Sequence, residues 1–105
     1  MARLRFQSRW IGPILDGRKV QTLRRPARLP RAVLALEIVE ASSNDAEPPF
    51  ARLQILSIDR VYVSHLAPVD ATREGLETLS ELRAVLRATY GTRPGKLVRI
   101  RFRVI

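Results

Sequence analysis

One long amphipathic helix near the end of the chain limits most strongly what this sequence can fold into. Between residues 79 and 90, apolar side chains recur at steps of three and four, the spacing of a single helix face. A capping box at Thr78–Glu81 precedes this pattern, and Gly91 follows it as a left-handed stop. No comparably regular helix separates the extended segments of the chain. This order argues against a doubly wound parallel sheet, in which helices alternate with strands, and favours an α+β domain.

Extended segments make up most of the remaining sequence. Alternating or β-branched apolar residues predict strands in five ranges, namely 3–6, 19–25, 33–40, 50–63 and 97–105. Within 50–63 the alternation is interrupted at Ser57–Arg60, so either one long strand with a bulge or two short strands would fit. In the last range we expect the alternate apolar side chains to face the core: Val98, Ile100, Phe102 and Val104.

Short helices and loops connect these segments. Apolar residues at helical spacing predict a short helix over 9–16, which Gly17 would end. Asp70 can cap a further helical turn over 71–74, and a glycine follows it. The polar, acidic range 41–49 closes with two prolines and predicts an exposed, mobile hairpin loop. Because so few strands leave vulnerable edges, we expect the sheet to curl into a small β-barrel with short helices at its flanks.

The length of the chain sets its domain organisation. We expect its 105 residues to form one domain, 1–105, with a single core, since folding at this size buries roughly two-thirds of the surface of the unfolded chain. The longest stretch without Asp, Glu, Lys or Arg runs from Val61 to Val69, less than half of the roughly 20 residues that span a bilayer. The N-terminus has positive charge but no apolar run behind it, unlike a secretory signal. We therefore expect a cytoplasmic protein without membrane contact.

The content of cysteine and histidine excludes several kinds of chemistry. Cysteine is absent, and histidine occurs once, at His65. This excludes disulfide scaffolds, thiol nucleophiles, zinc fingers and a catalytic triad with its histidine elsewhere in the chain. A role in a loop or cap fits the lone His65 better than metal ligation. We expect no metal and no cofactor, which leaves hydroxyl, amine, guanidinium and carboxylate chemistry.

Positive charge gathers at both ends of the chain. The net charge is +9, with local values of +8 over residues 1–31, −4 over 32–92 and +5 over 93–105. If the two ends meet in the fold, they would create one basic surface for a polyanion, and nucleic acid is the polyanion we expect. A solvated basic face of an arginine-rich protein would have the same composition. The candidate nucleic-acid-binding residues are all arginines: Arg3, Arg5, Arg18, Arg25, Arg99, Arg101 and Arg103.

Two short segments combine residues that could carry chemistry. In the extended segment after Gly17, Thr22 and Arg24 point the same way, and Lys19 at the turn can converge with them on an anionic or carbonyl-bearing ligand. A solvated basic hairpin would have a similar composition. Farther along, Glu74 could shift the pKa of Lys19 if the two lay close together, or it could be an ordinary surface residue. The residues alone leave these alternatives open.

The order of these pieces resembles the ASCH domain family, a branch of the PUA-like superfamily, over nearly the whole chain. The range Gly17–Arg24 is similar to the family signature G-x-K-x-x-T-x-R, and Ala71–Gly75 is similar to its A-x-x-E-G turn. A helix ending at Tyr90-Gly91 and a last strand follow in the family order. Two positions depart from the pattern: Val20 replaces a frequent second threonine, and Leu29–Val33 replaces a Gly-Asp pair. The resemblance implies a PUA-like β-barrel and a cleft between the Gly17–Arg24 turn and the Glu74 turn.

The resemblance also implies a ligand, either RNA or a modified nucleoside, bound by Lys19, Thr22, Arg24 and Glu74. We expect first an RNA- or nucleotide-binding protein whose basic surface holds phosphates. The alternative is a small amidohydrolase acting on N4-acetylcytidine-type nucleosides, in which Lys19, Thr22 and Glu74 are catalytic. A lysine of lowered pKa would then help to deprotonate the threonine for attack on the amide carbonyl, while the glutamate transfers protons. Other family members are ribonucleases, and an adaptor for an acidic protein is a further possibility.

Overall fold

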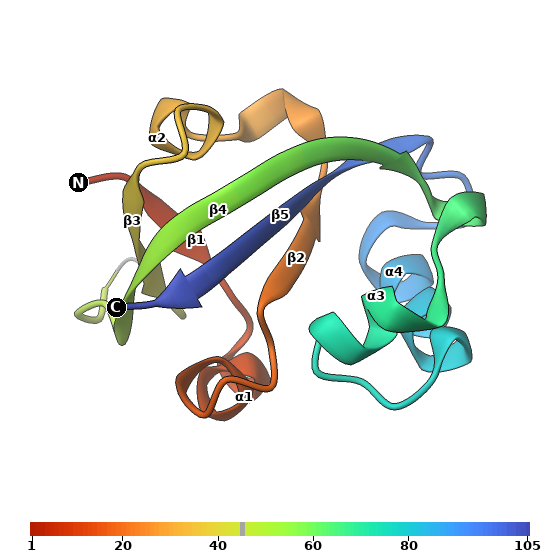
Figure 1. Cartoon of the computed structure of the whole chain (residues 1–105), viewed down its shortest axis with the longest axis horizontal. Coiled ribbons are helices and arrows are strands. Elements are labelled where there is room, and N and C mark those ends of the chain that lie inside the picture. Colours follow the sequence, from red (N-terminus) through yellow and green to blue (C-terminus); the bar gives the residue numbers. More distant parts are fainter. Residues whose placement is uncertain (45) are drawn as a thin grey trace.

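The computed structural model describes residues 1–44 and 46–105 and contains a five-stranded mixed sheet with short helices around it (Figure 1). The strands are β1 (Arg3–Arg5), β2 (Gln21–Arg24), β3 (Ile38–Ser42), β4 (Ala51–Tyr62) and β5 (Lys96–Val104). The α-helices are α1 (Ile11–Leu15), α2 (Arg31–Leu34), α3 (Pro68–Arg73) and α4 (Leu79–Tyr90). Three 3-10 turns complete the fold: η1 (Ser8–Trp10), η2 (Pro26–Arg28) and η3 (Val63–His65). None of the described helices has the length and apolar run needed to cross a bilayer.

The sheet is curled but open. Its strand order is β1-β3-β4-β5-β2, with β1 and β3 parallel and the other neighbours antiparallel. The long β4–β5 ribbon carries a bulge between Ile55 and Ser57, and the edge strands β1 and β2 both lie behind it in Figure 1. No strand ladder joins β1 to β2 in the described residues, so the closed barrel expected from the sequence is not shown. A side chain crosses this seam instead: Arg24 Nη2 donates to the Arg5 carbonyl at 2.7 Å.

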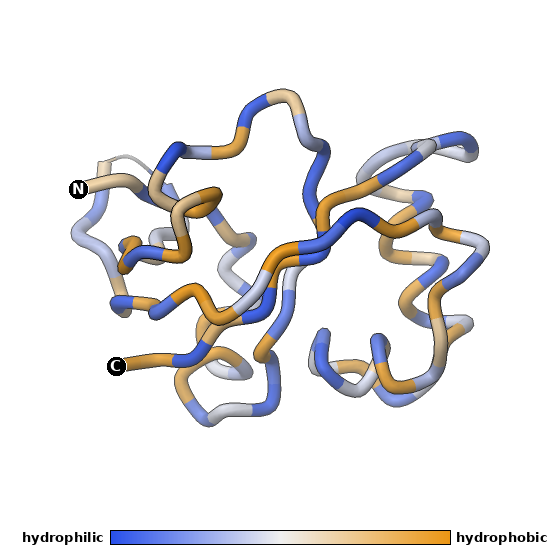
Figure 2. Tube along the Cα trace, turned by 45° about the horizontal axis from the view of Figure 1, so that its top comes forward, coloured by the Kyte–Doolittle hydropathy of each residue, from blue (hydrophilic) through white to orange (hydrophobic). Residues whose placement is uncertain are grey.

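Two apolar clusters lie on either side of β2. Along the central strands, hydrophobic and hydrophilic residues alternate (Figure 2), as expected for strands with one buried face. The first cluster fills the curl of the sheet and consists of Leu4, Phe6, Ile14, Val33, Val39, Ala41, Leu53, Ile55, Val98, Ile100 and Phe102. The second lies under α3 and α4 and consists of Leu23, Val61, Leu66, Ala71, Leu82, Leu86 and Leu97. The short strand β2 is therefore buried between them.

Most of the strands and the long helix follow the sequence pattern. The range 50–63 forms one long strand with a bulge, which was one of the two alternatives. Helix α4 begins at the predicted capping box, where the Glu81 amide donates to Thr78 Oγ1 at 3.1 Å and the Thr78 amide donates to Glu81 Oε1 at 3.1 Å. Position 45 of the predicted 41–49 loop lies outside the described residues. Beside it, Asn44 Oδ1 accepts hydrogen bonds from the amides of Ala46 and Glu47.

The predicted strand over 33–40 is wrong in its first half. Residues 31–34 form the single helical turn α2, which begins directly after Pro30 and buries Val33 completely. At Leu36 the backbone takes a positive φ of 57°, and this reverses the chain into β3. A run of apolar residues cannot distinguish a buried helical turn from a buried strand. The expectation that Val104 faces the core is also wrong, because its side chain is exposed at the end of β5.

Asp70 ties α3 to the sheet. Helix α3 is longer than the turn predicted over 71–74, and the buried Asp70 carboxylate accepts from the Ala67 amide at 2.9 Å within its first turn. The same carboxylate accepts from Gln21 Nε2 at 3.2 Å and from Arg99 Nη1 at 3.0 Å. Burial raises the pKa of Asp70, but these three hydrogen bonds and the positive charge of Arg99 outweigh it, so the pKa is lowered. This network fixes the end of α3, where Glu74 lies, against β2.

We expect Asp70→Ala to lower the free energy of unfolding by about 3 kcal/mol, because it leaves the buried Gln21 amide without its acceptor and removes one of the two carboxylates that bind Arg99. Urea denaturation at neutral pH measures this loss. The matched control is Asp59→Ala, since Asp59 binds the same Arg99 through a largely exposed carboxylate and should cost less than about 1 kcal/mol.

The pH dependence of the same variants provides a second measurement. Because the pKa of Asp70 is lower in the folded chain than its ordinary 3.8, its charge stabilises the fold above that pH and the benefit is lost as the pH falls through the folded value. The stability advantage of the wild type over Asp70→Asn should therefore shrink in acid. An advantage that stays constant down to the acid transition would contradict the ionised role of Asp70.

Candidate functional site

Two turns that are far apart in the sequence meet through their backbones. Helix α1 ends before Gly17, whose φ of 84° turns the chain toward β2. An isolated antiparallel bridge then pairs Lys19 with Glu74, and the Val20 amide donates to the Arg73 carbonyl at 2.8 Å. Gly75 allows this close approach, because its φ is 83° and a Cβ there would lie 3.4 Å from the Lys19 Cβ. The Lys19 turn and the Glu74 turn are thus held together before their side chains interact.

The side chains of Lys19 and Glu74 form a buried ion pair. Lys19 Nζ donates to Glu74 Oε1 at 3.0 Å and to the Gln21 carbonyl at 2.9 Å, and it lies 4.6 Å from the centre of the Trp10 ring. Only 3% of Lys19 and 6% of Glu74 is exposed. The second carboxylate oxygen, Glu74 Oε2, has no hydrogen-bond partner among the described residues. One oxygen of the pair therefore keeps an unused acceptor position.

Burial shifts the pKa values of this pair toward each other. It lowers the pKa of Lys19 below the ordinary 10.5; Glu74 opposes this shift, while the positive charges of Arg24 and Arg9 add to it. Burial also raises the pKa of Glu74 above the ordinary 4.5, against the opposing effect of Lys19. Both shifts favour the uncharged forms. Proton transfer from the lysine to the glutamate is consequently easier here than it would be in water.

Thr22 is held by a cation rather than by the ion pair. Arg24 Nε donates to Thr22 Oγ1 at 3.0 Å, while the same guanidinium binds the Arg5 carbonyl and lies 4.7 Å from the centre of the Phe6 ring. Thr22 itself is 5% exposed. Since its oxygen accepts from Arg24, its own proton remains available to a base. A guanidinium in this position also stabilises negative charge on the hydroxyl oxygen.

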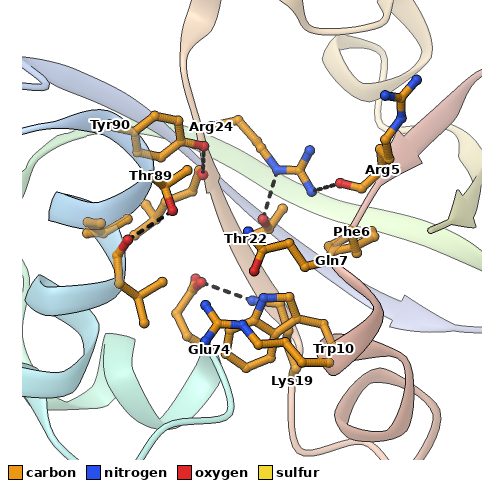
Figure 3. A pocket seen from close by; sticks show the side chains of 14 residues that line it. Arg5, Phe6, Gln7, Trp10, Lys19, Thr22, Arg24, Glu74, Thr89 and Tyr90 are labelled. Carbon is orange, nitrogen blue, oxygen red and sulfur yellow. Dashed lines mark hydrogen bonds and ion pairs between the residues drawn. The ribbon is translucent and has the colours of Figure 1, made fainter. Parts of the chain in front are cut away.

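The four predicted ligand-binding residues line one cavity of about 160 Å³ (Figure 3). In Figure 3, Lys19 and Glu74 lie at one side of the opening, and Thr22 and Arg24 lie above them. Aromatic side chains that the sequence patterns had indicated only as helix or core residues complete the walls: Phe6, Trp10 and Tyr90. An aromatic residue on a helix face is more often packed in a core, so no sequence signal separated these from ordinary packing residues. Tyr90 is anchored by its hydroxyl, which donates to the Leu23 carbonyl at 2.8 Å.

The candidate nucleic-acid-binding arginines differ in their environments. Arg99 is held by Asp59 and Asp70, and Arg18 is paired with Asp16. The row of outward arginines predicted on the last strand is therefore neutralised at its first member. Beyond Arg99, Arg101 is partly buried and Arg103 is exposed. The other three line a second cavity at the β1–β2 seam: Arg3, Arg5 and Arg25.

The structure also locates the lone histidine and the acidic side chains that could have bound a metal. His65 packs edge-on against Tyr62, with 5.5 Å between the ring centres. In the part of the chain that the structure describes, no group of three or more His, Cys, Asp or Glu side chains is placed to hold a metal ion.

Sequence comparison provides one informative relative. No family model matches the chain. A curated protein, N(4)-acetylcytidine amidohydrolase from Shewanella baltica, is 33% identical over 105 residues, which covers 98% of this chain and 94% of the relative.

Structure comparison agrees with this finding. The ASCH domain from Lactobacillus crispatus has a TM-score of 0.81 at 16% identity, covering 98% of this chain and 78% of that one. Protein EF3133 from Enterococcus faecalis has a TM-score of 0.70 at 16% identity, covering 99% of this chain and 79% of that one. At such identity the likeness establishes the fold. With the identity and coverage of the Shewanella relative, it shows that this chain belongs to the ASCH domain family.

Proposed function

We propose that the protein is an amidohydrolase that removes the acyl group from an N4-acylated cytidine, with Thr22 as the nucleophile. The observation that carries this proposal is the buried Lys19–Glu74 pair in the same cavity as a threonine whose oxygen is held by Arg24. The name of the Shewanella relative supplies the substrate class. In the sequence analysis the amidohydrolase was the alternative to an RNA-binding protein. The geometry of the cavity supports the amidohydrolase.

The first chemical step uses the lowered pKa of Lys19. The neutral amine accepts the Thr22 hydroxyl proton as the oxygen attacks the acyl carbon, and the pair supplies this neutral amine when Glu74 takes the lysine's proton. Glu74 Oε1 receives it along the 3.0 Å hydrogen bond from Lys19 Nζ. Negative charge then develops on the former carbonyl oxygen of the substrate, within the cavity that the Arg24 guanidinium lines. A fixed cation in a buried site stabilises such charge without reorganisation.

The second step releases the products. The bond between the acyl carbon and N4 breaks, the protonated Glu74 donates its proton to the departing N4, and cytidine leaves with its amino group restored. Water then attacks the acyl ester on Thr22, with the Lys19–Glu74 pair accepting one proton and returning one to the threonine oxygen. The acid is released and the starting state of Thr22 is regenerated.

RNA or nucleotide binding without hydrolysis is the second candidate function. It is supported by the excess of basic residues, 19 against 10 acidic ones, and by the arginines that surround the β1–β2 seam. The same cavity would then recognise a base rather than cleave an amide bond.

We expect Lys19→Met, Thr22→Val and Glu74→Gln each to lower kcat for N4-acetylcytidine by about 100-fold or more, because each removes a base, nucleophile or acid. Cytidine release measured by chromatography gives the rates, and circular dichroism shows whether each variant folds. The control is Lys96→Met, which changes the chain's only other lysine, an exposed one at the start of β5. Full activity of Thr22→Val would rule out a threonine nucleophile. Binding of unmodified RNA with no deacetylation by the wild type would favour the second candidate.

A pH profile tests the protonation state of the lysine. The mechanism needs one proton on the Lys19–Glu74 pair, because Glu74 passes it to N4, so kcat/KM should fall at alkaline pH as Lys19 loses its proton to solvent, at a pH below the ordinary lysine pKa of 10.5. Arg24 lowers the pKa of Lys19 by its charge. In Arg24→Gln the falling limb should therefore move to higher pH.

The matched comparison is Arg9→Gln. Arg9 acts on Lys19 in the same direction but contributes less than Arg24, so its removal should shift the limb less. A falling limb that Arg24→Gln leaves in place would show that the titrating group is not Lys19.

A further inference from the structure

A second cavity lies at the open seam of the sheet. It has a volume of about 790 Å³ and is formed by β1, β2, η2 and the end of β3. In Figure 1 the segment that carries η2 arches over β2 and continues into α2. The seam is the gap between the edge strands β1 and β2, which no ladder joins in the described residues. The fold thus leaves a hollow where a closed barrel would have paired strands.

Guanidinium groups dominate the wall of this cavity. Five of its ten described lining residues are arginines, and none of the ten is acidic: the arginines are Arg3, Arg5, Arg24, Arg25 and Arg28. Two of them are fixed by the fold, since Arg24 binds Thr22 and the Arg5 carbonyl, and Arg25 Nη2 donates to the Tyr90 carbonyl at 2.9 Å. Arg3 Nε pairs with Glu40 Oε1 at 3.5 Å, whereas Arg28 is exposed and has no ion pair with any described residue. The positive charge of Arg24, Arg25 and Arg28 has no carboxylate among the lining residues to compensate it, and such a concentration of charge favours an anion.

A buried hydroxyl in the same wall points independently to a ligand. Ser42 lines the cavity and is only 1% exposed, yet its Oγ has no hydrogen-bond partner among the described residues. A buried hydroxyl without a partner costs free energy. An oxyanion in the cavity could accept its proton while the guanidinium groups bind the remaining oxygens.

The second cavity adjoins the proposed active site. Arg5 and Arg24 line both cavities. A ligand with its acylated base in the first cavity would therefore have the second cavity beside it, across the Arg24 guanidinium. In a cytidine nucleotide the anionic group is the phosphate, which is attached to the ribose close to the base.

We propose that the seam cavity is a phosphate site, with Arg25, Arg28 and Ser42 binding the phosphate of a substrate whose acylated base occupies the first cavity. The inference rests on the proposed amidohydrolase function and narrows its substrate to phosphorylated N4-acylcytidine, as a nucleotide or within RNA. Arg24 stands at the boundary between the two cavities, where it contacts Thr22 on one side and lines the phosphate site on the other.

The test compares kcat/KM for N4-acetylcytidine, its 5′- and 3′-monophosphates, and a short RNA that contains a single N4-acetylcytidine. One charge-assisted contact corresponds to about a tenfold preference, so we expect the wild type to favour a phosphorylated substrate by at least that factor at low salt. In Arg28→Gln and Ser42→Ala the ratio of kcat/KM for phosphorylated and unphosphorylated substrate should fall toward one. Arg60→Gln is the control, because Arg60 is an exposed arginine on β4 that lines neither cavity, and it should keep the wild-type ratio.

The substrates distinguish the source of the phosphate. Preference for a monophosphate, with no further gain for RNA, supports a site for the phosphate of a free nucleotide. Preference for the RNA supports a site for the polynucleotide backbone. Equal kcat/KM for all substrates, with the same ratio in every variant, overturns the phosphate site and leaves the amidohydrolase intact.

A binding measurement separates failure of the site from failure of the proposed function. If no substrate is deacetylated, the amidohydrolase proposal fails, and calorimetric titration with cytidine monophosphate still tests the cavity. Binding that weakens about tenfold in Arg28→Gln but not in Arg60→Gln would support the phosphate site. Binding that neither variant alters would overturn it.

Discussion

The buried ion pair between Lys19 and Glu74 connects the two halves of this structure. These residues are 55 positions apart, and their backbones are bridged as well as their side chains. Removing two charges from water is unfavourable, and their attraction offsets this only when the geometry is good. The fold supplies that geometry through Gly75 and the Asp70 network. The pair is thereby fixed in a buried position, and burial shifts both pKa values toward the uncharged forms.

The division of the core around β2 explains where the site lies. One apolar cluster fills the curl of the sheet and the other lies under α3 and α4. A strand between two clusters is buried on both sides, so polar side chains on it must find partners within the protein. On β2, Gln21 binds Asp70 and Thr22 accepts from Arg24. Hydrogen bonds within the protein therefore fix the orientation of these buried polar side chains.

The open seam gives Arg24 several roles at once. Its guanidinium spans the gap between β1 and β2, holds the Thr22 oxygen and lines both cavities. A closed barrel would have replaced this side chain with strand hydrogen bonds. The open sheet lacks ladder bonds at this seam but retains the Arg24 cation between the two cavities.

The sequence by itself determined the parts that depend on local periodicity and spacing. One short stretch of sequence is enough to predict the capping box and apolar face of the helix at 78–90, and another predicts the alternation of the last strand. The family motifs indicated that the turns at Lys19 and Glu74 form one cleft. Tertiary structure alone decided that 31–34 is helical, because a short apolar run fits either state until its neighbours are known. It also decided that Arg99 is neutralised by Asp59 and Asp70 and that Trp10 faces the ion pair. These features depend on residues distant in sequence, and a local pattern carries no information about which distant partner will be within a few ångströms.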